Sequence, residues 1–447
     1  MVNLLWTTTC LLLSCSTAVT ASALPDPLAD ADDRSPRPKA RIPPPLSVGD
    51  YALQKVLSDA EDIFGYYDYP PDPKKKSRIN MSRCEWMSNL PDDAPLHQLN
   101  IPGAHASATW SYTNTTTHHS ILPTSHIQCQ TSSLIDSLNA GIRFFDLTFG
   151  INPLTGKSLL LYHNAALLSY HATLESVLFG FYTWLSAHPS EALFLSLQYF
   201  HPHQISSALN INPPHQSKID QLIYNLITSR PAKRYIHQSK TLPLSLGSCR
   251  GKIILLRRFD LPHITTNSHL PGIHLSPLHY PPFTSSQSPF TLTYGSRYNK
   301  HHQHQTLHIS DWHDLSSSSS PLRSPESHIS AKLTVVASHL SQAAKGHGPE
   351  AVKSDNELWI TFASGQNILN KPVPITPELL ALGSEDTTTT KAGVNKGVCK
   401  ILRQLKNKRL GIVVVDFWEG EHGDLIGAIL GDWGNNGRYG GREGEYC

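Results

Sequence analysis

Short apolar runs alternate with amphipathic segments along most of the chain. The runs are rich in β-branched and aliphatic residues, which is typical of strands buried on both faces of a parallel sheet. Such strands are predicted at residues 141–149, 158–163, 192–200, 252–259, 358–364 and 411–418. Apolar residues at helical spacing predict helices at 173–188, 218–229, 328–344, 397–405 and 424–433. This alternation of strand and helix predicts an α/β fold.

Two polar segments interrupt the alternation. Residues 25–45 are rich in Pro, Asp and Arg, and we expect them to form a flexible leader. From about residue 261 to residue 327 the chain is crowded with His, Pro and Ser, including HHQHQ at 301–305 and SSSSSP at 316–321. We interpret this stretch as a long insertion. Its histidines could bind a metal, but carboxylates and cysteines at ligand spacing are absent, which favours a solvated loop.

The N-terminal residues indicate export. An apolar run ends in Ala21-Ser22-Ala23, the small-x-small pattern of a secretory cleavage site. No Lys or Arg precedes the run, so an uncleaved anchor is the alternative. Glycosylation acceptors begin at Asn80 and Asn114, which agrees with export. We therefore expect a secreted, extracellular protein that is soluble or peripheral.

Cysteine number and charge limit the possibilities further. Without the signal peptide the chain has five cysteines, Cys84, Cys129, Cys249, Cys399 and Cys447. This odd set permits at most two intrachain disulfides, and one thiol should be left over. Lys and Arg total 37 against 35 Asp and Glu. Such a balance gives no reason to expect a nucleic acid partner.

Candidate chemistry lies at the C-terminal ends of the predicted strands, where barrel proteins carry their active sites. The polar residues there are Asp146, His163, Gln198, Arg257, Arg258 and Asp416. His105 lies among small residues in IPGAHASATW and has no acidic neighbour in sequence. Two histidines, two carboxylates and arginines at one barrel mouth would suit acid–base chemistry on a phosphate ester. The alternative is that each residue only caps or salt-bridges the rim.

Several motifs follow one another in a recognisable order: IPGAHASATW, GIRFFDLTFG, LLLYHN, AHPSEALFLSL, RGKIILLRRFD, HISDWHDL and GIVVVDFWEG. In order and spacing they resemble phosphatidylinositol-specific phospholipase C of the X-domain type, in its bacterial-like single-domain secreted forms and their fungal relatives. The resemblance implies an irregular (β/α)₈ TIM-type barrel. The implied organisation is a signal peptide at 1–23, a flexible leader and N-terminal extension at 24–94, a phosphodiesterase barrel at 95–435 with its insertion at about 261–327, and a C-terminal tail at 436–447.

The resemblance also implies roles for individual residues. His105 matches the general base that activates the inositol 2-hydroxyl, and His163 matches the acid that protonates the leaving diacylglycerol oxygen. Asp416 matches the carboxylate that orients the base, and Asp146 joins this catalytic set. Further residues stand at substrate-binding positions: Arg258 and Asp311 where inositol hydroxyls are bound, and Gln198 and His313 where a lysine and an aromatic are usual.

The chain departs from the family pattern at two positions. Ala106 follows the first histidine, where the family usually has an acidic residue, and Thr148 stands where an arginine usually balances the phosphate charge. Strand alternation points Arg143 to the opposite face, while Lys157 or Arg257 could reach the site instead. An oxygen cage for calcium is hard to build around Ala106 and Thr148. We therefore expect a calcium-independent site with no metal and no cofactor.

Two hypotheses follow. The first is an enzyme that cleaves phosphatidylinositol or a related glycosyl-phosphatidylinositol at a membrane surface. The second is an impaired barrel that binds lipid or sugar outside the cell. Aromatic residues of the insertion could touch the membrane or pack against the barrel; they are Tyr280, Phe283, Phe290, Tyr294 and Tyr298. The sequence does not predict the oligomeric state.

Overall fold

The computed structural model describes residues 47–67, 81–113, 122–200, 215–265, 270–276, 280, 286–294, 305–317, 324–345, 357–386, 389–406, 408–420 and 424–431. The fold given below is that of the unit that begins at Ser47. The predicted signal peptide, the predicted C-terminal tail and both glycosylation acceptor asparagines lie outside the described residues.

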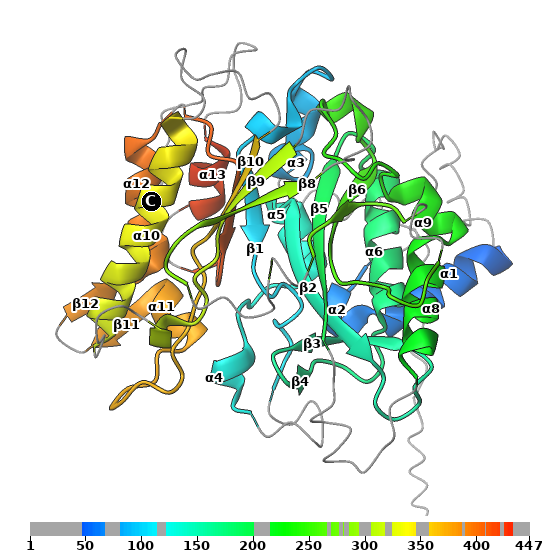
Figure 1. Ribbon diagram of the computed structural model, residues 1–447, viewed down its shortest axis with the longest axis horizontal. Helices are drawn as coiled ribbons and strands as arrows, with labels where there is room; N and C mark the ends of the chain where they lie inside the picture. Colours follow the sequence, from blue (N-terminus) through cyan, green and yellow to red (C-terminus); the bar gives the residue numbers. More distant parts are fainter. Residues whose placement is uncertain are drawn as a thin grey trace, which may run out of the picture. The chain divides into compact units, whose positions relative to one another are not determined.

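Parallel strands form the centre of the fold (Figure 1). Their order in the sheet is β7-β6-β5-β2-β1-β13-β10-β9. Their bounds are β1 Ile101–Ala104, β2 Phe144–Ile151, β5 Ala192–Tyr199, β6 Lys252–Arg258, β7 Ile273–His274, β9 Gln305–Ser310, β10 Glu357–Phe362 and β13 Ile412–Val415. An antiparallel strand, β8 Phe290–Tyr294, pairs with the outer side of β9. Within the described residues the end strands β7 and β8 do not pair with each other. The sheet is thus a nearly closed, irregular barrel, and the predicted α/β barrel class is confirmed.

Helices cover the outside of the sheet (Figure 1). Those after the first barrel strand are α4 Thr124–Ile127, α5 Leu134–Ala140, α6 Leu174–Ala187, α8 Gln216–Ile227, α9 Arg230–Tyr235, α10 Pro325–Lys345, α11 Pro377–Leu382, α12 Val394–Gln404 and α13 Leu425–Leu430. The start of α6 follows from sequence, because the Thr173 hydroxyl accepts a hydrogen bond from the Ser176 amide and caps the first turn. Across the described residues, no helix combines the length and the apolar character needed to cross a membrane.

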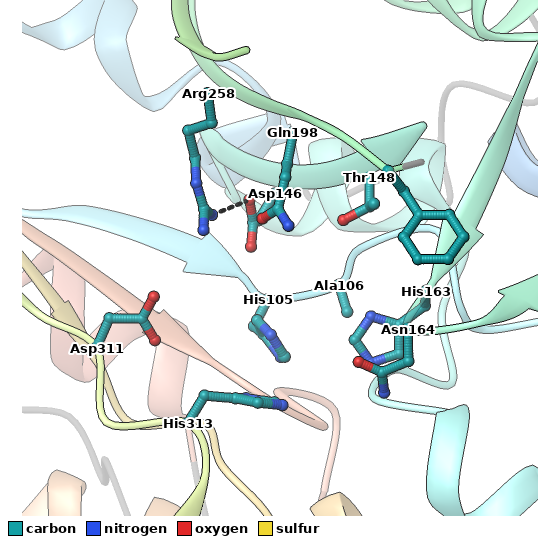
Figure 2. A pocket seen from close by; sticks show the side chains of 11 residues that line it. His105, Ala106, Asp146, Thr148, His163, Asn164, Gln198, Arg258, Asp311 and His313 are labelled. Carbon is teal, nitrogen blue, oxygen red and sulfur yellow. Dashed lines mark hydrogen bonds and ion pairs between the residues drawn. The ribbon is translucent and has the colours of Figure 1, made fainter. Parts of the chain in front are cut away.

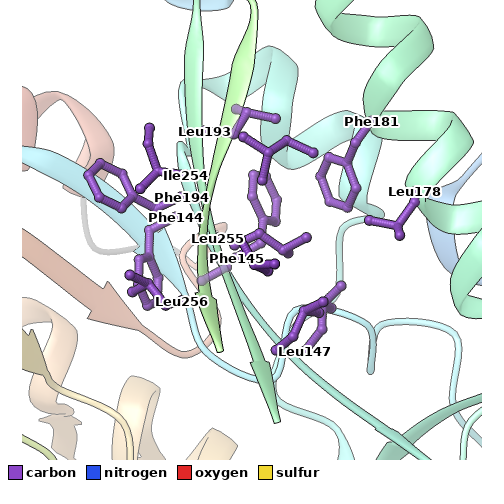
Figure 3. Close-up of a cluster of buried hydrophobic side chains, with 14 of the residues drawn as sticks. Phe144, Phe145, Leu147, Leu178, Phe181, Leu193, Phe194, Ile254, Leu255 and Leu256 are labelled. Carbon is purple, nitrogen blue, oxygen red and sulfur yellow. The ribbon is translucent and has the colours of Figure 1, made fainter. Parts of the chain in front are cut away.

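The core explains why the strands read as continuous apolar runs. Along β2, Phe144 points into the barrel, with its ring 6.2 Å from that of Phe362 on β10. The next residue, Phe145, points outward and lies 5.1 Å from Phe181 of α6, as Figure 3 shows beside Leu178 of the same helix. Both faces of the strand are therefore buried, which removes the alternation of polar and apolar residues seen in half-exposed strands.

The prediction that residues 158–163 form a strand is confirmed, but its assignment to the parallel set is wrong. This segment is β3 Leu159–His163, which pairs antiparallel with β2 and with the short β4 Ala166–Leu167. The error arises because LLLY is as apolar as its parallel neighbours, and an apolar run does not encode strand direction. His163 thus reaches the site from a hairpin that folds back over β2.

The interpretation of residues 261–327 as a single insertion needs correction. This stretch supplies β7, β8 and β9 to the sheet, and β9 pairs in parallel with β10. The prediction missed β9 because QTLHIS follows a His-rich tract and carries polar side chains within the strand. The polar tracts at 301–304 and 318–321 lie outside the described residues.

The predicted flexible leader at 25–45 lies outside the described residues, and the rest of the N-terminal extension contains short helices. They are α1 Val48–Asp59, α2 Glu61–Phe64, α3 Met81–Cys84 and a 3₁₀ turn at Trp86–Asn89; a second 3₁₀ turn, Leu96–Gln98, comes just before β1. Ile63 and Phe64 are buried, and the indole N–H of Trp110 donates to the Ile63 carbonyl at 2.8 Å. The part of the 24–94 segment that the structure describes is therefore packed onto the barrel.

Candidate active site

Strand register gathers polar side chains inside the C-terminal end of the barrel. Thr148 on β2 lies opposite Gln198 on β5, and Gln198 lies opposite Arg258 on β6. Asp146 is two residues before Thr148, so alternation turns it to the same side. Figure 2 shows the resulting pocket, lined by His105, Ala106, Asp146, Thr148, His163, Asn164, Gln198, Phe200, Arg258, Asp311 and His313. The structure thus brings together all the predicted site residues except Asp416, which lies behind His105.

The first histidine is paired with a carboxylate. His105 follows β1, and its Nδ1 lies 2.8 Å from Oδ1 of Asp416, which follows β13. These two strands are adjacent and parallel, so residues far apart in sequence end at the same height. Burial would lower the pKa of His105, but the charge and the hydrogen bond of Asp416 outweigh it and raise the pKa above 6.5.

The second histidine faces the first across the pocket. The rings of His105 and His163 are perpendicular, with centroids 5.7 Å apart. No carboxylate of the described residues hydrogen-bonds His163; its Nε2 lies 3.7 Å from the thiol sulfur of Cys129. Burial and the neighbouring histidines lower the pKa of His163 well below 6.5. The two imidazoles therefore have pKa values displaced in opposite directions.

A third histidine completes the cluster. The ring centroid of His313 lies 5.0 Å from that of His105 and 6.5 Å from that of His163 (Figure 2). Burial and the charge of His105 lower its pKa to about 3, so that His313 is neutral at physiological pH. A neutral imidazole can donate and accept hydrogen bonds, as a ligand rich in hydroxyl groups requires.

Arg258 lies at the centre of a buried polar network. Its guanidinium lies 3.5 Å from Asp146 and stacks over the ring of Tyr280 at 3.7 Å. The Tyr280 hydroxyl donates to Asp311 at 3.0 Å. Burial lowers the pKa of Arg258, but the acidic groups around it outweigh that effect and keep it charged. The network holds one cation between two carboxylates on one wall of the pocket.

The other basic residues considered from sequence do not line the pocket. Arg143 is fully buried and donates to Glu191 through Nε and Nη2, at 2.9 and 2.8 Å, so the prediction that it faces away is confirmed. Arg257 precedes Arg258 on β6 and points to the other face, and Lys157 is exposed in the β2–β3 loop. Among the described residues that line the pocket, only Arg258 is permanently cationic.

Sequence reasoning missed several residues of the site. Asn164 and Phe200 line the pocket; Asn164 follows one predicted strand and Phe200 ends another, which could have indicated them. Tyr280 was considered only as packing or membrane contact; it is buried beneath Arg258, far from any strand motif. Cys129 was considered only for disulfides. Its sulfur meets His163 at the end of β3, and no local pattern predicts this contact.

The described cysteines correct the expectation of one leftover thiol. Cys84, Cys129 and Cys249 are buried and form no disulfide. Hence at most one intrachain disulfide can form among the five cysteines that follow the predicted signal peptide.

One group of described residues has donor atoms close enough to be considered for a metal. A nitrogen of His105, the sulfur of Cys129 and an oxygen of Asp416 lie within 4.8 Å of one another. Calcium requires six or more oxygen ligands, which this set cannot supply. Moreover, the imidazole and the carboxylate point at each other in a direct hydrogen bond. The geometry is that of an oriented histidine with a thiol beside it.

Comparisons with known proteins agree with the motif resemblance. Over 187 residues the chain is 33% identical to 1-phosphatidylinositol phosphodiesterase of Listeria monocytogenes, covering 41% of this chain and 51% of the relative. It is 26% identical over 176 residues to PI-PLC X domain-containing protein 3 of Danio rerio, covering 35% of this chain and 51% of the relative. The chain thus matches about half the length of these curated relatives. No family model matches the sequence.

Solved structures support the fold. A double mutant of phosphatidylinositol-specific phospholipase C from Staphylococcus aureus aligns with a TM-score of 0.56 at 16% identity, covering 81% of this chain and 99% of that chain. The enzyme from Listeria monocytogenes aligns with a TM-score of 0.50 at 22% identity, covering 78% and 97%. The resemblance to phosphatidylinositol-specific phospholipase C seen in the motifs is therefore confirmed in sequence and in fold.

Proposed function

We propose that this chain is a phosphoric diester hydrolase of the phosphatidylinositol phospholipase C type, acting on phosphatidylinositol or a glycosyl-phosphatidylinositol. The observation that carries the proposal is the pairing of His105 with Asp416 at 2.8 Å, opposite a second histidine in the same pocket. One imidazole oriented by a carboxylate and one without a carboxylate partner suit a base and an acid acting in sequence.

His105 is the base of the first step. It takes the proton of the inositol 2-hydroxyl, and the freed oxygen attacks phosphorus to form the cyclic phosphodiester. Asp416 fixes the ring orientation and stabilises the imidazolium that forms, as the raised pKa of His105 indicates. Because Asp416 is only 1% exposed, water competes little for this carboxylate.

His163 is the acid that protonates the leaving diacylglycerol oxygen. In the free protein burial and the neighbouring histidines hold its pKa well below 6.5, so the ring is neutral. A bound phosphodiester adds a negative charge beside the ring and favours its protonated form. Substrate binding thus prepares the acid that protonates the diacylglycerol oxygen as its bond to phosphorus breaks and the cyclic phosphodiester forms.

The residues proposed to bind the substrate lie on the wall of the pocket that contains Arg258. Arg258, Asp146 and Asp311 present charged donors and acceptors to the inositol hydroxyls, and Gln198 and His313 add neutral ones. Each hydroxyl can both donate and accept, so a mixed set of this kind recognises a polyol. No metal or cofactor is invoked, since the proton transfers need only the histidines.

Contact with a membrane surface is part of the proposal. The loop that follows β10 exposes Leu369 by 79% and Val373 by 44%, with Lys371 between them. It leaves the barrel at the C-terminal ends of the strands, where the pocket lies. Exposed apolar side chains beside a lysine suit an anionic lipid surface. Of the insertion aromatics, Tyr280 and Tyr294 are buried and Phe290 packs against the core, whereas Phe283 and Tyr298 lie outside the described residues. Secretion, supported by Ala21-Ser22-Ala23, would give such a protein access to outer-leaflet glycolipids.

The test is release of water-soluble phosphoinositol from phosphatidylinositol vesicles by the purified protein in the presence of a chelator. His105→Ala should lower the rate by about 100-fold or more, because the base is lost. His171→Ala is the matched control: His171 is exposed and does not line the pocket, so the rate should not change. Equal rates for the parent and His105→Ala would contradict the proposed mechanism.

A second candidate function is favoured by the charge of the pocket. Thr148 replaces the expected arginine and Ala106 the expected acid, and no described basic residue substitutes for them near His163. Losing such a group typically costs about 100- to 1000-fold in rate. An inactive parent whose Thr148→Arg variant gains turnover would indicate a lipid- or sugar-binding barrel that has lost catalysis.

A further inference from the structure

Cys129 lies close to both candidate catalytic histidines and to Asp416. Its sulfur lies 3.7 Å from Nε2 of His163 and within 4.8 Å of the nearest donor atoms of His105 and Asp416. The residue is fully buried and does not line the pocket. The thiol thus lies next to the acid and close to the pair formed by the base and its carboxylate.

The backbone around Cys129 is held tightly by the same strand ends. Its amide donates to the Thr109 hydroxyl at 2.9 Å, and its carbonyl accepts from the Phe417 amide at 2.8 Å. The next side chain, Gln130, donates to the carbonyls of His105 and Val415 at 2.8 and 3.0 Å. These bonds fix the thiol relative to the turns that carry His105 and Asp416.

The Cys129 thiol has a hydrogen-bond acceptor of its own, because its sulfur lies 3.6 Å from the Ile127 carbonyl oxygen. His163 has no carboxylate partner, and Ala106 offers no polar side chain to it. A neutral thiol can donate one hydrogen bond and accept another. Burial, with the charge of Asp416, raises the pKa of Cys129 well above its usual value, which keeps the S–H donor in place.

We propose that Cys129 is a positioning residue that accepts the Nε2–H of His163 on its sulfur, while its own S–H donates to the Ile127 carbonyl. This holds His163 in the tautomer with its proton on Nε2, so that Nδ1 faces the leaving group. In the reaction, protonated His163 gives its Nδ1 proton to the departing alkoxide and keeps its Nε2–H on the sulfur. The effect of Cys129 on the reaction rate rests on the proposed function, whereas its effect on the tautomer of His163 does not.

The kinetic test compares two esters of inositol phosphate. Phosphatidylinositol has a poor alkoxide leaving group that needs an acid, whereas a nitrophenyl ester leaves without one. Cys129→Ala should slow cleavage of phosphatidylinositol by about 10- to 100-fold and that of the nitrophenyl ester by less than about 3-fold. Cys129→Ser keeps a donor and an acceptor and should recover part of the loss. Equal losses on both esters, or no loss on either, would overturn the proposal.

Cys249→Ala is the matched control. Cys249 is also fully buried, but its thiol hydrogen-bonds the backbone carbonyls of Ser245 and Leu246 and does not line the pocket. The variant should leave both rates unchanged. A selective loss on phosphatidylinositol in this control would mean that any small cavity in the barrel disturbs the acid, which contradicts a specific role for Cys129.

A second measurement separates this inference from the proposed function. Nitrogen-15 shifts of the His163 ring, assigned with His163→Gln, report which ring nitrogen carries the proton. The parent should show the Nε2–H tautomer, and Cys129→Ala should show a mixture. If the parent cleaves neither ester, the proposed function fails, and this measurement alone decides the inference. The same tautomer in both proteins would refute it.

Discussion

The residue after each candidate catalytic histidine, and the residue after Asp416, adopts a left-handed backbone. Ala106, Asn164 and Phe417 have φ values of 40°, 51° and 46°, and they follow His105, His163 and Asp416. Such conformations cost about 1–3 kcal/mol for residues other than glycine, so the surroundings must hold them. The Thr109 hydroxyl donates to the Ala106 carbonyl, and the Cys129 carbonyl accepts from Phe417. Each strand thus ends in a sharp turn that directs its last side chain into or behind the pocket.

The pairing of His105 with Asp416 leads to a prediction about charge. The carboxylate raises the pKa of His105 despite burial, so Asp416→Asn should lower that pKa below the parent value. Because His105 must be neutral to act as a base, the asparagine variant should hold the active base form at lower pH. Its rate should nevertheless fall by about 100-fold or more, since the amide favours the wrong tautomer. NMR titration of His105 with parallel rates checks both parts, and an unchanged pKa would argue against the pairing.

At the scale of elements, close packing joins the N-terminal helices to the barrel. A Cβ added at Gly180 of α6 would lie 2.6 Å from the ring of Phe64, which is buried between α2 and α6. Phe64 also meets Phe181 edge to face, with centroids 5.4 Å apart. Helices α2 and α6 can approach this closely only because position 180 lacks a side chain.

Gly180→Ala should therefore destabilise the protein. Alanine favours a helix by about 1 kcal/mol over glycine, but overpacking in a core costs about 1–3 kcal/mol, and the clash should prevail. Gly49→Ala is the control: Gly49 is exposed in α1 and its added Cβ would meet only Ser47 Oγ at 3.6 Å, so stability should rise slightly. Urea unfolding of both variants measures the difference. Stabilisation by both substitutions would show that Phe64 does not pack as described.

The strands also differ in how well the sequence predicts them. Strands β2, β5, β6, β10 and β13 were predicted because burial on both faces makes them apolar, and their last polar residues, such as Asp146 and Arg258, were then found at the pocket. The direction of β3 and the presence of β9 were not predicted, because the strands with which they pair lie far away in the sequence. Cys129 contacts His163 at the end of β3, and Tyr280 contacts Arg258 at the end of β6. Contacts between residues so far apart in the chain cannot be predicted from one sequence.

At the scale of the whole molecule, buried histidines make stability depend on pH. Burial lowers the pKa of His313 to about 3 and that of His339 to about 4, and His163 shifts in the same direction. In the unfolded chain these groups titrate near 6.5. Between about pH 6.5 and pH 3 the unfolded state therefore binds more protons than the folded one. His105 has the opposite sign: its raised pKa adds stability that is present below pH 6.5 and lost as the pH rises through its folded value.

Stability should therefore decrease as the pH falls below 6.5. For His313 alone the shift corresponds to roughly 5 kcal/mol over the full range. His313→Gln removes this titration, so its unfolding free energy should fall less steeply between pH 6.5 and pH 4 than that of the parent, whatever its value at pH 7. The exposed His171 supplies the control, because His171→Gln should leave the slope unchanged. Urea unfolding at several pH values measures these slopes. Equal slopes for the parent and His313→Gln would mean that His313 takes up a proton in the folded protein over the same pH range as in the unfolded chain. A charged imidazole beside His105 would then raise the free energy needed to form the imidazolium of the base.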